Sequence, residues 1–164
     1  MDQKLDNIRT QVMIESPLGW IRVQYDSDGI KSLNFVEYTL GDVHNIIDNQ
    51  LFSKIKTDIK AYFKKELRSF SIRLNPDGTP FQKSVWEELT KIPYGSTCTY
   101  RELAIRLGGI EKTRAVATAI AKNPILILIP CHRVIGSNGK LTGFSGGLER
   151  KRVLLELEGN AINE

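Results

Sequence analysis

The dipeptide Cys131-His132 carries the strongest signal for chemistry in this chain. It follows a run of apolar residues at 125–129 and Pro130, and a glycine-rich stretch comes after it. Only the thiolate form of cysteine is a good nucleophile, so a reactive cysteine needs a group that takes its proton. His132 is the candidate base, because the unperturbed pKa of histidine lies near neutrality. Neighbouring side chains of an extended segment point to opposite faces, so we expect a water molecule to bridge the two groups.

A histidine that acts as a base is usually oriented by a partner on its second ring nitrogen. The downstream carboxylates that could serve are Glu149, Glu156 and Glu158. A buried structural cysteine followed by a hydrogen-bonded histidine is the commoner arrangement in proteins. The dipeptide alone therefore leaves both interpretations open.

The composition is that of a globular protein from a reducing compartment. The chain has 164 residues, of which 41% are hydrophobic and 26% charged. Its two cysteines do not make a disulfide framework, and no apolar run approaches the ~18 residues of a membrane helix. Because the N-terminus carries no secretory signal, we expect a cytoplasmic protein without membrane contact. No zinc site is expected, since the soft ligands lack the usual spacing: His44, Cys98, Cys131 and His132. Of these, Cys98 is interpreted as structural.

Positive charge is concentrated in the second half of the chain. The formal net charge of +4 arises from residues 81–164, which hold 12 Lys and Arg against 8 Asp and Glu. Residues 99–133 alone contain six basic side chains and two acidic ones. Such a field attracts polyanions, although a solvated helix face has the same composition. The basic residues are Arg101, Arg106, Lys112, Arg114, Lys122 and Arg133.

The hydrophobic pattern of the first half predicts a sheet with helical cover. Three β-branched segments, TQVMIES, WIRVQYD and IKSLNFVEY, are separated by turn-forming residues and predict an antiparallel meander. Apolar residues then recur at three and four positions over 42–67, which predicts one or two amphipathic helices. SFSIRL could return as a short strand. The stretch NPDGTP at 75–80 marks the domain boundary.

The second half predicts three helices and a buried strand. The helices are expected over 81–92, 100–107 and 112–122, with Thr97 or Thr99 as the cap of the second and Glu102 in capping-box spacing. The last two helices and the Gly108-Gly109 turn form a helix-turn-helix pattern, which also occurs in proteins that bind no nucleic acid. The alanine-rich third helix could approach a surface closely or pack against another helix. The apolar run at 125–129 is expected to be a strand.

The second half of the chain contains a series of short motifs. They are GTPFQ (78–82), Trp86, IPYG (92–95), TYRELA (99–104), TRAV (113–116), NP (123–124), IPCHRV (129–134), NGKLTGFSGGL (138–148) and LLELEG (154–159). Together these motifs resemble the O6-alkylguanine-DNA alkyltransferases, the direct-reversal DNA repair proteins. The similarity covers the whole C-terminal half with close spacing, whereas the N-terminal half resembles the family in general shape only. The resemblance implies an α+β fold: a three-stranded antiparallel sheet with a helix (ribonuclease H-like) over 1–77, and a mostly helical domain with the helix-turn-helix over 78–164.

The resemblance assigns chemical roles to four residues. Cys131 would accept the alkyl group from O6 of guanine in one in-line displacement, and His132 would draw the thiol proton through a water. Glu158 matches the carboxylate that orients this histidine, and Asn123 matches the hinge between the recognition helix and the active-site strand. No means of regenerating the cysteine is visible. The protein would therefore act once, without metal or cofactor.

The resemblance also assigns residues to DNA recognition. Arg114 matches the arginine that fills the gap left by an extruded nucleotide, and Tyr100 matches the tyrosine that contacts the base and helps rotate its phosphate. Ser145 would lie near O6, and the carbonyls of Val134 and Cys131 would accept from the exocyclic amine. The partner implied is double-stranded DNA, entered from the minor groove by a monomer. Further DNA or base contacts are expected from Thr99, Arg101, Thr113, Ala115 and Ser137.

Two other functions stay open at this point. An alkyltransferase-like protein would recognise the lesion without repairing it, but such proteins replace the acceptor cysteine, which is present here. A cysteine hydrolase with a Cys-His-Glu arrangement would turn over. Within the resemblance, Phe144 stands where many members have tyrosine, and Thr142 and Gly143 lie in a variable pocket loop, so the accepted alkyl size and activity on O4-alkylthymine are not determined.

Overall fold

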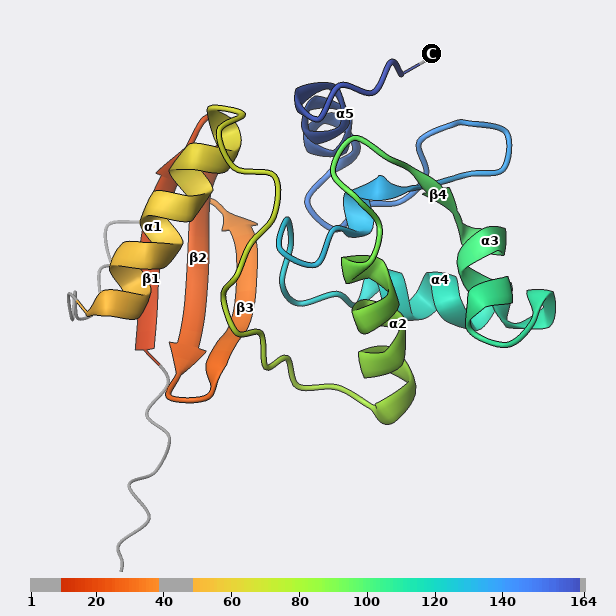
Figure 1. The fold of residues 1–164 in the computed structure, drawn as a ribbon, viewed down its shortest axis with the longest axis horizontal. Coiled ribbons are helices and arrows are strands. Elements are labelled where there is room, and N and C mark those ends of the chain that lie inside the picture. The colour runs from red at the N-terminus through yellow and green to blue at the C-terminus, as the bar shows by residue number, and fades with distance from the viewer. Residues whose placement is uncertain (1–9, 39–48, 163–164) are drawn as a thin grey trace, which may run out of the picture. The chain divides into compact units, whose positions relative to one another are not determined.

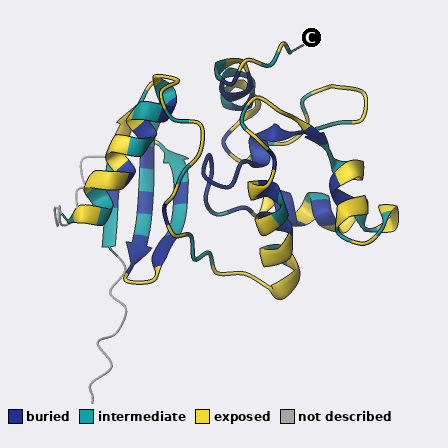
Figure 2. Ribbon diagram, viewed as in Figure 1, coloured by how far each residue is buried: buried dark blue, intermediate teal, exposed yellow. Residues whose placement is uncertain are grey.

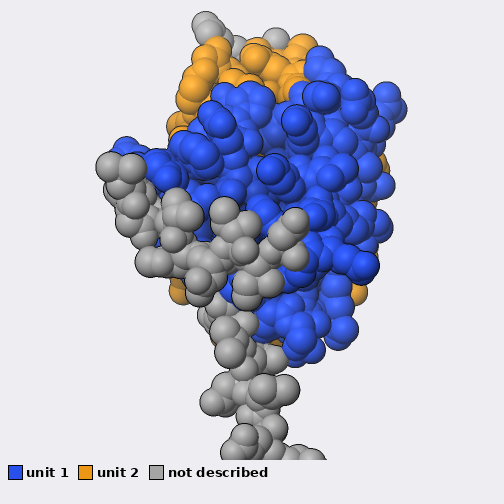
Figure 3. Space-filling view, turned by 90° about the vertical axis from the view of Figure 1, so that its left-hand side faces the viewer, with its two compact units in different colours: residues 1–76 blue, residues 77–164 orange. Residues whose placement is uncertain are grey.

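The computed structural model describes residues 10–38 and 49–162. The chain divides into two compact units, Met1–Pro76 and Asp77–Glu164, which Figure 3 colours blue and orange. The division falls within the 75–80 stretch, where two prolines and a glycine occur together. Each unit has its own core and is described by itself. None of the helices in these ranges has the length and apolarity needed to cross a membrane.

The first unit is the predicted antiparallel meander with one helix against it (Figure 1). Strands β1 (Thr10–Ser16), β2 (Gly19–Asp26) and β3 (Gly29–Val36) pair in that order, and Val12, Val23 and Leu33 lie in register across them. Helix α1 (Gln50–Phe63) is capped by Asn49 and buries an apolar face against the sheet. The part of the predicted 42–67 helical region before residue 49 lies outside the described residues.

The predicted SFSIRL strand is wrong. Only Leu74 forms a bridge, with Ile30, and residues 69–73 make no ladder. The backbone of Arg73 passes so close to Gly29 that a Cβ there would lie 2.5 Å from the Arg73 carbonyl oxygen. Pairing stops after Leu74 because the turn-forming stretch at 75–80 follows at once.

The second unit begins with helix α2 (Pro80–Thr90), whose start is strongly encoded. Thr79 and Gln82 form a capping box, and Pro80 occupies the first turn, where its missing N–H costs nothing. The predicted inward residues of this helix are buried, namely Val85, Trp86 and Leu89. The indole N–H of Trp86 donates to the carbonyl of Ala119 at 2.9 Å, which fixes α2 against α4.

The helix-turn-helix consists of α3 (Tyr100–Arg106), a 3-10 turn (Ile110–Lys112) and α4 (Thr113–Ala121). Thr99 caps α3 in the predicted box with Glu102. Gly108 has a φ of 114°, a left-handed conformation that favours glycine and ends the helix. Helices α3 and α4 pack closely and face the loop that contains the cysteine.

The predicted strand at 125–129 is also wrong. The run folds into a tight turn in which the N–H of Ile129 donates to the carbonyl of Ile125 at 3.0 Å, and Ile127 has a φ of 69°. Asn123 holds this turn, because its amide donates to the carbonyl of Ile129 and its oxygen accepts from the N–H of Ile125. Figure 2 shows this stretch as buried, so its apolar residues reflect burial on all sides rather than a strand.

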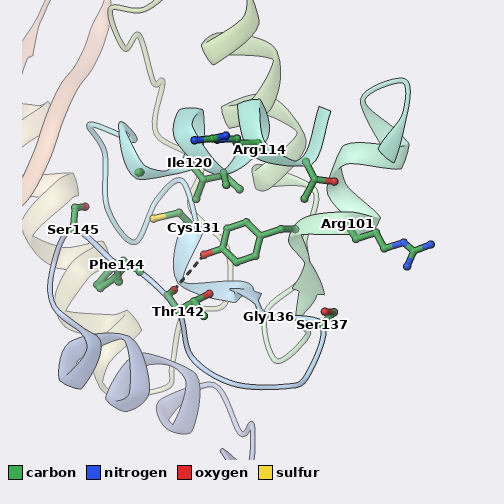
Figure 4. A pocket seen from close by; sticks show the side chains of 14 residues that line it. Arg101, Arg114, Ile120, Cys131, Gly136, Ser137, Thr142, Phe144 and Ser145 are labelled. Carbon is green, nitrogen blue, oxygen red and sulfur yellow. Dashed lines mark hydrogen bonds between the residues drawn. The ribbon is translucent and has the colours of Figure 1, made fainter. Parts of the chain in front are cut away.

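The segment after this turn supplies the remaining elements of the second unit. A 3-10 turn (Cys131–Arg133) leads into β5 (Val134–Ile135), which pairs in parallel with β4 (Cys98–Thr99). The glycine-rich loop, residues 136–147, follows and connects to α5 (Leu148–Leu157). Cys131 therefore lies beside α3, α4 and the glycine-rich loop, as Figure 4 shows.

Candidate functional site

A pocket of about 760 Å³ opens between α3, α4 and the glycine-rich loop, with Cys131 in its wall (Figure 4). The hydroxyl of Tyr100 donates to the carbonyl of Thr142 at 3.2 Å across this pocket, a bond drawn as a dashed line in Figure 4. This volume lies within the range of about 300–1,000 Å³ that is usual for small-molecule pockets in proteins. The residues that line it are Tyr100, Arg101, Thr113, Arg114, Ala117, Ile120, Ala121, Cys131, Gly136, Ser137, Thr142, Gly143, Phe144 and Ser145.

Cys131 is almost completely buried and is a free thiol. Burial raises its pKa to about 11, although the side chain of Asn123 and the charge of Lys151 act in the opposite direction. The sulfur is therefore protonated at neutral pH. It needs a group that removes its proton at the moment of reaction.

His132 is fully buried behind this cysteine, and its Nε2 lies 2.8 Å from Oε1 of Glu158. Burial lowers the pKa of His132, with the Glu158 carboxylate opposing that shift, so the ring is neutral near pH 7. Because Glu158 accepts, Nε2 carries the ring proton and Nδ1 presents a lone pair. Nδ1 is buried and has no hydrogen-bond partner among the residues described.

We expected no direct contact between the side chains of Cys131 and His132, because neighbouring side chains of an extended segment point to opposite faces. That reason is wrong, since both residues lie in a 3-10 turn. The two side chains nevertheless make no direct hydrogen bond within the described ranges. Of the three candidate carboxylates, the structure brings Glu158 to the histidine. Glu149 instead pairs with Arg152 at 2.7 Å on the surface, and Glu156 is exposed.

The charge pattern of the sequence placed Arg133 on the basic surface, but Arg133 is buried and binds the carboxylate of Glu158. Its Nε donates to Oε2 of Glu158 at 2.8 Å, its Nη2 donates to Oε1 at 2.9 Å, and its Nη1 donates to the carbonyl of Ile92. Burial alone would raise the pKa of Glu158, but hydrogen bonds from His132 and Arg133 hold it at about 2. The carboxylate that orients His132 thus stays ionised at every physiological pH.

The IPYG motif supports this buried pair. The carbonyl of Ile92 accepts from Arg133, and the Tyr94 ring lies 5.9 Å from the Arg133 guanidinium carbon. The Tyr94 hydroxyl donates to the carbonyl of Leu157, next to Glu158. Gly95 has a φ of 78°, and a Cβ there would lie 3.1 Å from the Glu158 carbonyl oxygen. A glycine is therefore needed where this turn meets the end of α5.

The predicted DNA-contacting residues fall into two groups. Tyr100, Arg101, Thr113, Arg114, Ser137 and Ser145 line the pocket. Thr99, Ala115 and Val134 do not: the Thr99 side chain caps α3, Ala115 is exposed on α4, and Val134 is buried in β5. The alanines of α4 divide similarly, since Ala119 is buried beside Trp86 whereas Ala117 and Ala121 line the pocket.

Sequence reasoning missed two buried cations next to this pocket, Arg133 and Lys151. Lys151 is fully buried in α5, and its ammonium donates to the carbonyl of Val134 at 2.6 Å. The sequence indicates that Lys151 is buried, because it precedes the apolar Leu154 and Leu155 by three and four residues and so shares their helix face. Within the described ranges, no group of three or more His, Cys, Asp or Glu side chains could hold a metal ion.

Comparison with known proteins agrees with this geometry. Residues 80–160 match the family model described as 6-O-methylguanine DNA methyltransferase, DNA binding domain, and residues 11–76 match the model of its ribonuclease-like domain. A methylated-DNA–protein-cysteine methyltransferase of Methanosarcina acetivorans is 46% identical over 151 residues, 90% of this chain and 97% of the relative. The Mycobacterium tuberculosis protein of that name is 44% identical over 147 residues, 88% of this chain and 89% of the relative.

Solved structures extend the similarity to the fold. The Mycobacterium tuberculosis OGT crystallised in complex with DNA is 43% identical, with a TM-score of 0.80, over 90% of this chain and 92% of that one. An O6-methylguanine DNA methyltransferase of Methanococcus jannaschii is 26% identical, with a TM-score of 0.67, over 93% of this chain and 96% of that one. With both family models matched and identities well above 30% over most of its length, this chain belongs to the 6-O-methylguanine DNA methyltransferase family.

Proposed function

We propose that this protein repairs alkylated DNA by moving the alkyl group from O6 of guanine to the sulfur of Cys131. The observation that carries the proposal is a cysteine in the wall of a pocket with room for a purine, backed by a buried histidine–glutamate pair. In the reaction the sulfur–carbon bond forms as the carbon–oxygen bond breaks, and the purine leaves with its oxygen restored. O4-alkylthymine carries an equivalent ether, so the same step applies to it if the pocket admits the smaller ring.

The proton of Cys131 passes to His132 through one water molecule. Two observations support this path: Nδ1 of His132 is buried and has no hydrogen-bond partner in the described part of the chain, and Nε2 is committed to Glu158 at 2.8 Å. An imidazole with a free lone pair and a lowered pKa is neutral near pH 7 and can accept the thiol proton. Glu158 then stabilises the imidazolium, because a carboxylate with a pKa of about 2 remains charged throughout.

The alkylated nucleotide reaches Cys131 only after leaving the helix stack, since O6 is inaccessible inside a duplex. Arg114, exposed near the start of α4, is placed to occupy the vacated position with a planar cation. Tyr100 and Arg101 begin α3 beside the pocket, where they contact the extruded nucleotide and its phosphates. Ala115 and Thr113 on α4 allow the close approach that entry through the minor groove requires.

Inside the pocket, the guanine is recognised by its edge. The carbonyls of Cys131 and Val134 accept from the exocyclic amine, and Ser145 and Ser137 lie on the lining where O6 and its substituent would sit. The Val134 carbonyl already accepts from Lys151 at 2.6 Å, but a carbonyl oxygen has a second lone pair. Asn123 anchors the turn before Cys131 and so fixes the position of the sulfur.

Cys131 would accept one alkyl group per chain. The protein would act as a monomer. Among the described residues, the pocket lining holds no cysteine besides Cys131, so no second thiol is present to take the alkyl group from it. This separates the proposal from a hydrolase, which would release product repeatedly, and from a lesion-binding protein, which would leave the alkyl group on DNA.

A label-transfer assay tests the proposal. Duplex DNA with radiolabelled O6-methylguanine is incubated with wild-type protein, Cys131→Ser and Cys98→Ser, the last being a matched control because Cys98 is also a buried free thiol. We expect label on wild type and Cys98→Ser, at no more than one methyl per chain, and none on Cys131→Ser. Label retained on tightly bound DNA would support the lesion-binding function instead, and label released over many cycles would support a hydrolase.

A further inference from the structure

A second pocket, of about 700 Å³, lies within the first unit, where helix α1 packs against strand β1 (Figure 1). Its apolar lining comes from Ile14 and Trp20 of the sheet and from Ile59 and Phe63 of the helix. Among the described residues, none lines both this pocket and the one that contains Cys131. The function proposed above therefore makes no use of it.

Three lysines of α1 border this pocket. Lys56, Lys60 and Lys64 recur at every fourth position, so they lie on one face of the helix and its C-cap. All three are exposed, and none of the ion pairs within the described residues involves them. Like charges at this spacing disfavour a helix, so the fold gains nothing from the row. Since Glu15 is the one acidic residue of the described lining, the border of the pocket is positively charged.

Strand β1 forms an edge of the sheet, because β2 is its one paired neighbour among the described strands. The unpaired N–H and C=O groups of an edge strand can bind another extended chain. Proteins often protect such an edge with a lysine, a proline or a bulge in the strand itself. The sequence of β1, TQVMIES, has neither residue, and its register with β2 is uninterrupted. A further strand can therefore add to β1 beside the pocket.

The charge of the lysine row distinguishes between possible occupants. If a second copy of the chain paired through the same edge, the two-fold contact would bring each lysine row against its own counterpart. Duplex DNA would attract the lysines, but it would offer mainly phosphates and sugars to the apolar lining. An extended acidic segment with aliphatic or aromatic side chains matches the strand edge, the lining and the lysines together.

We propose that the groove between β1 and α1 is a docking site for an extended, acidic segment of a partner protein. The segment adds to β1 as a further strand, and its apolar side chains enter the pocket against Trp20 and Phe63. Its carboxylates lie beside Lys56, Lys60 and Lys64, and the same lysines repel basic segments. Because the site does not include Cys131, this proposal does not rest on the proposed alkyl transfer.

Trp20 reports on this site directly. The chain has two tryptophans, and the other, Trp86, is buried in α2 and does not line this pocket. In protein labelled with 5-fluorotryptophan, the Trp20→Phe variant assigns the two fluorine NMR signals. The probe is a short peptide of aspartates with a leucine and a phenylalanine two positions apart, which places both on one face of an extended strand. We expect the peptide to shift the Trp20 signal alone and to slow amide hydrogen exchange over Thr10–Ser16.

A variant of the lysine row tests the charge. Exposed ion pairs contribute little one at a time, so Lys56→Gln, Lys60→Gln and Lys64→Gln are combined. We expect the combined variant to bind the peptide at least about tenfold more weakly, with folding checked by urea denaturation. The matched control is Lys54→Gln, since Lys54 pairs with Asp58 at 2.9 Å on the same helix and should leave peptide affinity as in wild type. A peptide with alanines in place of leucine and phenylalanine should also bind more weakly.

Several results would overturn the proposal. They are an unchanged Trp20 signal at saturating peptide, an unchanged affinity in the combined lysine variant, and unchanged hydrogen exchange in β1. A shift of the Trp20 signal by undamaged duplex DNA, lost in the lysine variant, would assign the row to DNA instead. Self-association in sedimentation velocity that requires the β1 edge would assign the groove to a second copy of the chain.

Discussion

The two cysteines of this protein lie close together in the fold but in opposite chemical settings. Cys98 is in β4, which pairs with β5, and Cys131 lies in the turn that leads into β5. Both are buried free thiols, and burial raises the pKa of each. Burial by itself therefore does not separate a structural thiol from a reactive one.

The difference lies in what surrounds each sulfur. Cys98 has Glu102 near it, but that carboxylate is committed to capping α3, and no histidine of the described residues accompanies it. Cys131 opens to the pocket, and the His132–Glu158–Arg133 cluster stands behind it. The comparison shows that Cys131 differs from Cys98 in its access to a pocket and in the buried histidine behind it, and the predictions below test whether these two features make Cys131 the reactive thiol.

The largest effect is expected from Glu158→Gln. This change removes the carboxylate that orients His132 and leaves Arg133 as an unpaired buried charge. We expect the rate of alkyl transfer to fall by about 100-fold or more and the free energy of unfolding to fall by about 3–5 kcal/mol. Stopped-flow or label-transfer rates and urea denaturation measure the two effects.

The matched control is Glu102→Gln, the carboxylate near Cys98. Glutamine also serves at this position of a capping box, as Gln82 does in α2, so the change should cost less than about 1 kcal/mol of stability and leave the rate within about twofold of wild type. If the Glu158→Gln protein transferred the alkyl group at the wild-type rate, the Glu158 carboxylate would have no part in the mechanism, whatever the stability of the variant.

The next effect concerns DNA access to Cys131. Arg114→Ala should slow repair of duplex DNA by about 10- to 100-fold, because the vacated stack is no longer filled and base flipping costs a few kcal/mol. Reaction with free O6-benzylguanine should be unchanged. Arg106→Ala is the control, since Arg106 is an exposed cation of the same motif outside the pocket lining. Equal loss on both substrates would argue against base flipping by Arg114.

Acid should destabilise the protein through the cluster behind Cys131. The pKa of His132 is lowered, so below its ordinary value of about 6.5 the unfolded chain binds a proton that the folded chain does not. The pKa of Glu158 is lowered to about 2, so the stability it contributes is complete above about pH 4.3 and is lost as the pH falls towards 2.

The free energy of unfolding, measured by urea denaturation, should therefore decline steadily below pH 6.5. Glu158→Gln should show a shallower decline between pH 4.3 and 2, and Cys98→Ala should follow wild type in shape. A flat profile between pH 6.5 and 3 would contradict the buried, neutral state of His132.

The smallest effect is expected from Cys98→Ala. The sulfur makes a long contact of 3.5 Å with the carbonyl of Thr99 and a weak hydrogen bond with Glu102, so its removal costs mainly packing. We expect about 1 kcal/mol of lost stability and a rate within about twofold of wild type. A loss of alkyl transfer comparable to that of Cys131→Ser would show that the two thiols are not distinct in function.

Local signals predicted many elements and a part of the site. The three strands of the meander, the capped starts of α2 and α3 and the inward residues of α2 follow from alternation, caps and periodicity. The pairing of His132 with a downstream glutamate follows from chemistry, and the choice of Glu158 among three candidates came from the family resemblance. These features depend on neighbours within a few residues or on motif spacing.

The errors came from buried segments with no periodicity. The run at 125–129 is apolar at every position, and such a run fits a strand or a fully enclosed turn equally well. Asn123 decides between them by bonding both Ile125 and Ile129. Arg133 was placed on a basic surface because its charge is visible in the sequence, whereas its burial against Glu158 is not.

The sequence by itself determined the family and the helix-turn-helix and predicted the nucleophile and its base, because residue types and spacings encode these features. Only the tertiary structure decided which buried charges meet: Arg133 with Glu158, and Lys151 with the carbonyls of Val134 and Thr142. These partners are 9 to 25 residues apart along the chain. A buried ion is tolerated only where the folded chain supplies its hydrogen bonds, and that supply is a property of three-dimensional packing.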